Sequence, residues 1–209
     1  LPQRDEKDAS LPQEYLLFSF NIIRCIPHLI LFYLHKNKSI IRADMERGFE
    51  LMGKSIEHEF NFKQPFGLIY LLTFCRQFRN LFYYRTRPYS ILPRLICPEL
   101  PTLTIQSKQI GEGLAIVNGF ATAIGAESIG KNCIIYQQVT LGGTKYGAPK
   151  ILDNVTISSG AIILGKVTIG NNVVIGANAT VFKDVPDNCT VMPASSLIMK
   201  WGNSNTHIV

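Results

Sequence analysis

Aliphatic residues recur at every sixth position through the C-terminal half of the chain. One unbroken series runs through Ile151, Ile157, Ile163, Ile169, Ile175 and Val181. Earlier series with the same step are Ile129, Ile135 and Leu141, and, after a one-residue slip, Ile110 and Ile116. An α-helix repeats every 3.6 residues and a flat strand every two, so neither explains a period of six. A triangular coil with six residues per side does, which predicts a left-handed parallel β-helix from about Ile105 to Met192.

The corners of this β-helix are expected to carry glycine and asparagine, because these residues tolerate positive φ angles. They are Gly130, Asn132, Gly170, Asn171, Asn172, Gly176 and Asn178. The step from Leu141 to Ile151 is ten residues instead of six, which predicts a four-residue bulge within GGTKYGAPK. Insertions in a solenoid gather on one face and often carry function, so the loop 142–150 is a candidate functional segment.

The N-terminal half has helical spacing instead. In GLIYLLTFCRQFRNLFYYRTR the residues on one predicted helix face are Leu68, Leu71, Leu72, Cys75, Phe78, Leu81 and Phe82. Arg76, Arg79 and Asn80 are expected on the opposite face. An earlier helix is predicted from Ser39 to Glu59. The predicted organisation is a flexible N-terminus (1–10), an α-helical domain with a proline-marked connector (11–103), the β-helix (104–192) and a C-terminal tail (193–209).

Residues 15–34 (YLLFSFNIIRCIPHLILFYL) are the stretch that most resembles a membrane span. Arg24, Pro27 and His28 lie in its middle, where a charge costs several kcal/mol in a lone membrane helix. We therefore expect one or two buried or interface helices, with contact at a membrane surface left open. No signal peptide is visible. The expected location is the cytoplasm, including the inner face of the membrane.

The amino-acid composition excludes few classes of binding partner. The net charge of +6 suits phosphate-bearing ligands, anionic polysaccharide or a membrane surface, and selects none of them. No basic run is interleaved with aromatic residues, so no nucleic-acid partner is expected. The five cysteines are odd in number, widely spaced and form no CxxC pair, which argues against a disulfide framework or a zinc site and fits a reducing cytoplasm. Each cysteine is expected to be a small buried hydrophobic residue.

The sequence of motifs along the coil carries a family resemblance. The run QQVTLGGTKYGAPKILDNVTISSGAIILGKVTIGNNVVIGANATVFKDVPDN resembles the serine acetyltransferase branch of the hexapeptide acyltransferases. Its TLGG, SGA, IGANA and KDVP motifs follow that order, and the resemblance covers residues 104–198. The motif NGFAT followed by NCIIYQQVTLG looks like the variants of bacterial capsule and exopolysaccharide gene sets, which normally read HGFAT.

The resemblance implies an acetyl-CoA-dependent O-acetyltransferase of the bacterial cytoplasm. It implies a homotrimer, or a dimer of trimers, with sites in the grooves between neighbouring β-helices, and it implies no metal. The positions matching the family's acetyl-CoA contacts are Gly143, Ser159 and Ala177, with Lys183 as a phosphate contact. Small residues at coil corners let the amides of an extended pantetheine arm approach the backbone.

At the family's catalytic position, this chain does not carry the expected residue. Acetyl transfer to a hydroxyl needs a base, and the family's histidine is replaced by Asn118, whose amide cannot accept a proton. The family's serine-binding charges are also absent, since Val117, Gly147 and Ala148 occupy those positions. The histidines of the chain are His28, His35, His58 and His207, and none lies in a recognisable motif.

Three explanations of Asn118 remain open: a deliberate replacement of histidine, a natural relative without turnover, or catalysis by proximity with a loss of about 10²–10⁴-fold. The leading hypothesis is transfer of acetyl to a sugar hydroxyl of a bacterial surface polysaccharide or its precursor. The alternatives are a serine O-acetyltransferase of cysteine biosynthesis and a non-catalytic trimeric acetyl-CoA-binding or scaffold protein.

Overall fold

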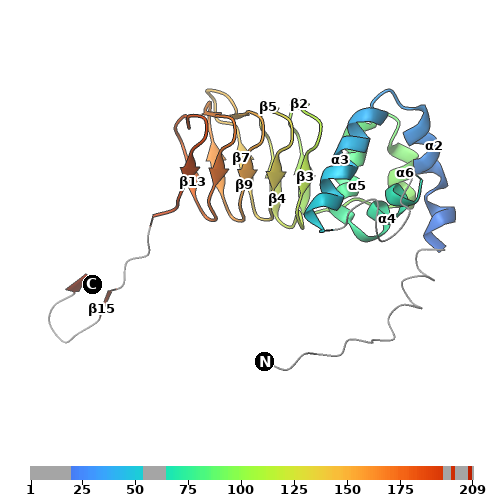
Figure 1. Cartoon of the computed structure of the whole chain (residues 1–209), viewed down its shortest axis with the longest axis horizontal. Helices are drawn as coiled ribbons and strands as arrows, with labels where there is room; N and C mark the ends of the chain where they lie inside the picture. The colour runs from blue at the N-terminus through green and yellow to red at the C-terminus, as the bar shows by residue number, and fades with distance from the viewer. Residues whose placement is uncertain (1–19, 54–64, 195–198, 201–206, 209) are drawn as a thin grey trace.

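The computed structural model describes residues 20–53, 65–194, 199–200 and 207–208. Helices occupy one end of the molecule and a long β-coil the other (Figure 1). After a helical turn at 20–24, the helices are α2 (Ile26–Leu34), α3 (Lys38–Leu51), α4 (Phe66–Phe74), α5 (Arg76–Arg85) and α6 (Ile91–Ile96).

The coil is built from three parallel sheets. The first holds β1 (Leu103–Ile105), β4 (Thr122–Ile124), β7 (Thr140–Gly142), β10 (Ile162–Leu164) and β13 (Thr180–Val181). The second holds β2 (Gln109–Ile110), β5 (Ser128–Ile129), β8 (Lys150–Ile151) and β11 (Thr168–Ile169). The third holds β3 (Ala115–Ile116), β6 (Ile134–Ile135), β9 (Thr156–Ile157), β12 (Val174–Ile175) and β14 (Thr190–Val191). A short antiparallel pair, β15 (Met199–Lys200) and β16 (His207–Ile208), follows.

Successive strands move from one sheet to the next, so the chain winds as a parallel solenoid. The aliphatic series fills its interior: Leu141 pairs with Ile124 and Ile163 in adjacent coils, and all three are buried. Fully burying one such side chain contributes about 1.5–3 kcal/mol. The parallel β-coil predicted from the period of six is therefore confirmed.

Contrary to our expectation, not every asparagine and glycine at the corners adopts a positive φ angle. Asn132, Asn172 and Asn178 do have positive φ angles, of 56°, 56° and 59°. Gly130 and Gly170 do not; a Cβ on Gly170 would lie 2.7 Å from the carbonyl carbon of Pro186 in the next coil. These two glycines are required by the close approach of neighbouring coils.

The single helix predicted across residues 67–87 is wrong. Cys75, with φ −113° and ψ 82°, separates α4 from α5. Arg79 and Asn80, which were predicted to face away from the core, are buried. The Arg79 side chain donates to the carbonyl oxygens of Leu72, Thr73 and Pro98, at 2.6, 3.2 and 3.0 Å. Two of these three partners lie at the end of α4, next to the break.

The other helical predictions have mixed outcomes. The helix starting near Ser39 is α3, which ends at Leu51; its predicted end at Glu59 lies outside the described residues. The proline-marked connector contains α6. Within the described ranges no helix has the length and apolar character needed to span a bilayer. Four cysteines are buried as expected, whereas Cys189 is only partly buried.

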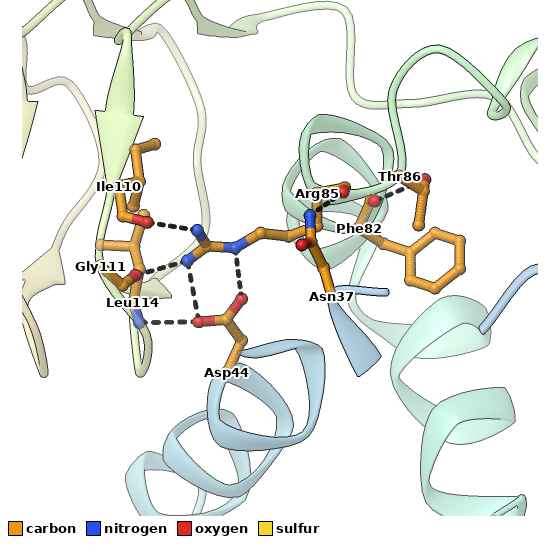
Figure 2. A network of polar contacts seen from close by, with 8 residues as sticks. All are labelled: Asn37, Asp44, Phe82, Arg85, Thr86, Ile110, Gly111 and Leu114. Carbon is orange, nitrogen blue, oxygen red and sulfur yellow. Dashed lines mark hydrogen bonds and ion pairs between the residues drawn. The ribbon is translucent and has the colours of Figure 1, made fainter. Parts of the chain in front are cut away.

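A buried polar network fixes the helices against the first coil (Figure 2). Arg85 of α5 donates from Nε to Asp44 Oδ2 of α3 at 2.9 Å, and from Nη2 to the carbonyl oxygen of Gly111 at 2.6 Å. Asp44 Oδ1 also accepts the Leu114 N–H at 3.0 Å. A buried ion pair is tolerated when its remaining hydrogen-bonding groups are satisfied, as they are here. The network therefore sets the position of α3 and α5 over the coil.

Candidate active site

The chain turns from the third sheet to the first at one corner of every coil, and this corner gathers most of the predicted site residues. It carries Asn118 between β3 and β4, Gln137 between β6 and β7, Ser159 between β9 and β10, and Ala177 between β12 and β13. Backbone bonds connect successive turns, including Asn178 N–H to the Ser159 carbonyl at 2.9 Å. We call this row the site corner. Asn118, Ser159 and Ala177 thus line up although 59 residues separate the first from the last.

The first turn of the site corner is longer than the others. Asn118 and Gly119 both have positive φ angles, of 62° and 64°. The Asn118 side chain is exposed, and its Nδ2 donates to Gln137 Oε1 at a long 3.4 Å. A Cβ on Gly119 would lie 2.9 Å from the Cβ of Gln77, so glycine here lets α5 approach the turn.

A cleft of about 170 Å³ lies between the helices and this turn. Its walls come from the end of α3 (Leu51, Met52), the start of α5 (Gln77, Phe78) and the first coil (Val117, Asn118). The helical half therefore completes a site that the coil alone leaves open on one side. Asn118 lies where that cleft meets the site corner.

Among the described residues that line the cleft, none is suited to act as a general base. Asp44 lines it, but both its carboxylate oxygens accept hydrogen bonds from Arg85. Burial raises the pKa of Asp44 to about 6, while the charge and hydrogen bonds of Arg85 oppose that rise. His28 and His35 lie outside the cleft, and His58 and the side chain of His207 fall outside the described residues. The cleft can orient a hydroxyl through amides without taking its proton.

The remaining predicted residues lie on the next corner, where the chain turns away from the first sheet. Gly143 follows β7 and Lys183 follows β13, and both are exposed. The ten-residue step between Leu141 and Ile151 forms the loop predicted there. Thr144 and Gly147 exchange backbone hydrogen bonds of 2.8 and 3.1 Å at its tip. The coil thus separates Gly143 and Lys183 from the site corner.

Sequence reasoning missed Gln137 and Gln77. Gln137 follows Ile135 by two positions, as Ser159 follows Ile157, so the six-residue register places it on the site corner. Gln77 belongs to α5, and no local pattern indicates which coil turn that helix faces.

Part of the coil matches a known family of repeats. Residues 148–183 match the bacterial transferase hexapeptide pattern of six repeats. The coil is built from that repeat. A serine acetyltransferase of Synechococcus elongatus is 37% identical over 127 residues, covering 56% of this chain and 51% of the relative. One of Staphylococcus xylosus is 47% identical over 97 residues, covering 44% and 45%. The chain spans about half the length of these curated relatives.

Solved structures show the same likeness. A serine acetyltransferase of Neisseria gonorrhoeae in complex with serine superposes with a TM-score of 0.58 at 26% identity, covering 75% of this chain and 66% of that one. The soybean serine acetyltransferase apoenzyme gives 0.55 at 26% identity, covering 82% and 68%. The similarity therefore extends beyond the repeats into the helical half.

These findings overturn the leading functional hypothesis. The similar proteins are serine acetyltransferases, so the assignment to the capsule branch and to a polysaccharide acceptor was wrong. That hypothesis rested on the five-residue motif NGFAT and on missing charges at Val117, Gly147 and Ala148. The likeness to a serine acetyltransferase extends over 127 residues instead.

Proposed function

We propose that this chain is an acetyl-CoA-dependent O-acetyltransferase of the serine acetyltransferase type, with serine as the acceptor. The observation that carries the proposal is the likeness to a serine acetyltransferase in complex with serine, which covers 75% of the chain. The cleft at Asn118 supports it, because a small acceptor fits a volume of about 170 Å³.

The acetyl-CoA arm would follow the coil corners. Ser159 and Ala177 are small residues on the site corner, and the backbone beside them offers hydrogen bonds to pantetheine amides. On the neighbouring corner, Gly143 would let the arm pass close to the chain. The exposed Lys183 would meet a phosphate.

Asn118 limits the rate of this reaction. The serine hydroxyl attacks the thioester carbonyl, and its proton must leave as the new ester bond forms. The Asn118 amide can accept a hydrogen bond from the hydroxyl and orient it, but cannot hold the proton. We therefore expect slow transfer driven by proximity, lower by about 10²–10⁴-fold than with a base in place.

The test is the variant Asn118→His. We expect serine-dependent release of CoA to rise by about 10²–10⁴-fold, measured by a thiol reagent under saturating acetyl-CoA. Gln138→His is the matched control: Gln138 is exposed, has a φ of 60° and lies on the same corner one turn away. It places an imidazole near the cleft without placing it at the reacting position, so its rate should stay at the wild-type level.

Two results would contradict the proposal. If neither wild type nor Asn118→His releases CoA with serine although calorimetry shows acetyl-CoA binding, the chain is a binding protein. The absence of a base from the described lining of the cleft favours that second candidate. If acetyl-CoA does not bind at all, both candidates fail.

We also propose a homotrimer as the working assembly. The outer faces of the coil expose apolar side chains, among them Phe120, Val174 and Phe182. A neighbouring coil packed on such a face would bury them and would form the groove that an extended acetyl-CoA arm needs.

A further inference from the structure

Two thiols and an imidazole meet in the interior of the helical half, away from the cleft. Cys25 directly precedes α2, His28 lies in the first turn of α2, and Cys97 directly follows α6. The three residues are 1%, 0% and 1% exposed. One potential ligand atom from each lies within 4.8 Å of the other two. The fold thus joins groups that are 72 residues apart into one buried cluster.

The hydrogen bonds around His28 identify the nitrogen whose lone pair is available to a ligand. The Tyr83 hydroxyl donates its hydrogen to the Cys97 carbonyl oxygen, so it can only accept from His28 Nε2, 2.9 Å away. Nε2 therefore carries the proton, and Nδ1 has a free lone pair. That Nδ1 is buried and has no hydrogen-bond partner in the described part of the chain. Burial lowers the pKa of His28 to about 4, so the ring is neutral at pH 7.

The two thiols also influence each other. The hydrogen bond from Cys25 lowers the pKa of Cys97, and the charges of Arg24 and Arg79 act in the same direction. The same hydrogen bond, together with burial, raises the pKa of Cys25. Thiolate sulfur and neutral imidazole nitrogen are the ligands preferred by zinc and similar soft divalent ions.

We propose that Cys25 Sγ, Cys97 Sγ and His28 Nδ1 form a binding site for a thiophilic divalent ion, with zinc as the expected occupant. In tetrahedral zinc sites with Zn–S of about 2.3 Å and Zn–N of about 2.0–2.1 Å, ligand atoms lie roughly 3.5–3.8 Å apart. The cluster needs a contraction of roughly 1 Å from its upper limit of 4.8 Å to reach that geometry.

Charge and protons balance in this site. Binding of one Zn²⁺ would release the thiol protons of Cys25 and Cys97 to solvent, and the ion with its two thiolates would carry no net charge. The nearby Arg24 and Arg79 oppose a bare cation, and this neutrality removes most of that repulsion. A fourth ligand would be a water molecule. Tyr83 would hold the His28 ring in place through its hydrogen bond to Nε2, as hydrogen-bond partners of ligating histidines do in other metal sites. The bound ion would join the start of α2 to the end of α6.

The test uses the reduced full-length chain, loaded with zinc or cobalt and then dialysed against metal-free buffer. We expect one ion per chain by elemental analysis, and a thiolate-to-cobalt charge-transfer absorption with Co²⁺. Both should be lost in Cys25→Ser, Cys97→Ser and His28→Gln. The matched controls Cys189→Ser and His35→Gln, which change the same residue types outside the cluster, should retain them.

Several results would contradict the proposed metal site. Retention of substantially less than one zinc per wild-type chain would overturn the site, and so would full zinc content in the three variants. A Cys25–Cys97 disulfide found by mass spectrometry in the zinc-loaded chain would also count against it. If a serine variant fails to fold by circular dichroism, zinc addition to wild type decides: a rise in Tm, abolished by a chelator, supports the site, and an unchanged Tm refutes it.

Discussion

Glycine and asparagine do different things at the corners of the coil. Asn132, Asn172 and Asn178 adopt the left-handed conformation, which asparagine tolerates better than most residues. Asparagine side chains also connect adjacent coils; Asn172 Nδ2, for example, donates to Asn188 Oδ1 at 2.9 Å. Gly170 instead leaves room for the backbone of the coil above it. Corner residues therefore set both the turn and the spacing of the coils.

Gly170→Ala should destabilise the chain by about 1–3 kcal/mol, because the new methyl group would overlap the Pro186–Asp187 backbone. Urea unfolding followed by circular dichroism measures the change. Gly48→Ala is the matched control: its Cβ would meet only Leu71 Cδ2 at 4.0 Å, inside helix α3. Alanine there should stabilise by about 0.5–1 kcal/mol. Equal changes in both variants would contradict the close-approach explanation.

At the scale of elements, the join between helices and coil depends on one buried charge pair. Arg85 on α5 and Asp44 on α3 are almost fully buried, and together they bind the backbone of Ile110, Gly111 and Leu114 in the first coil. The cleft at Asn118 is bounded by the same helices. The pair therefore positions the wall of the candidate site as well as stabilising the fold.

Asp44→Asn should cost about 3–5 kcal/mol, because it leaves the Arg85 charge buried without its partner. Denaturant titration measures the loss. Glu50→Gln serves as the control, since Glu50 pairs with Arg47 at the surface, where an ion pair contributes less than about 1 kcal/mol. A loss below 1 kcal/mol for Asp44→Asn would show that the pair does not hold the helices on the coil.

At the scale of the whole molecule, the coil buries its inward residues and leaves flat outer faces. Val174 on the third sheet is 40% exposed, and Phe182 beside β13 is 64% exposed. Exposed apolar side chains on these faces would be buried by a neighbouring coil. In the proposed trimer, the groove for acetyl-CoA would form where two coils meet, which links the proposed assembly to the proposed function.

Sedimentation equilibrium should give three times the 23.4 kDa of one chain, and six times that mass would indicate a dimer of trimers. Val174→Glu should shift the mass towards the monomer, because a carboxylate in an apolar interface is costly to desolvate. Ser39→Glu, at an exposed position of α3, is the control and should leave the assembly intact. A monomer at micromolar concentration in the wild type would contradict the trimer.

The coil and its register were predictable from the six-residue period. The reason is that a repeat of six residues is local: each side of the coil places its aliphatic residue inward by the same geometry, so the register of the strands follows by counting. Asn118, Ser159 and Ala177 were selected through the family resemblance instead, and Gln137 on the same corner was missed. The loop after Gly143 followed from the same count. The family resemblance marked residue 118 as the position of the base, and the amide of Asn118 showed that no base stands there.

The contribution of the helices depends on tertiary packing and could not be predicted from helical spacing. Whether Arg79 faces solvent depends on the break at Cys75 and on the carbonyl groups that it exposes, and helical spacing carries no information about either. The closeness of Gln77 to the Asn118 turn, and of Cys25 and His28 to Cys97, depends on packing between segments far apart in sequence. Spacing alone argued against a metal site because no CxxC pair is present. Folding brings the start of α2 close to the end of α6, and with them the three proposed ligands. The spacing of these residues along the sequence does not reveal that closeness.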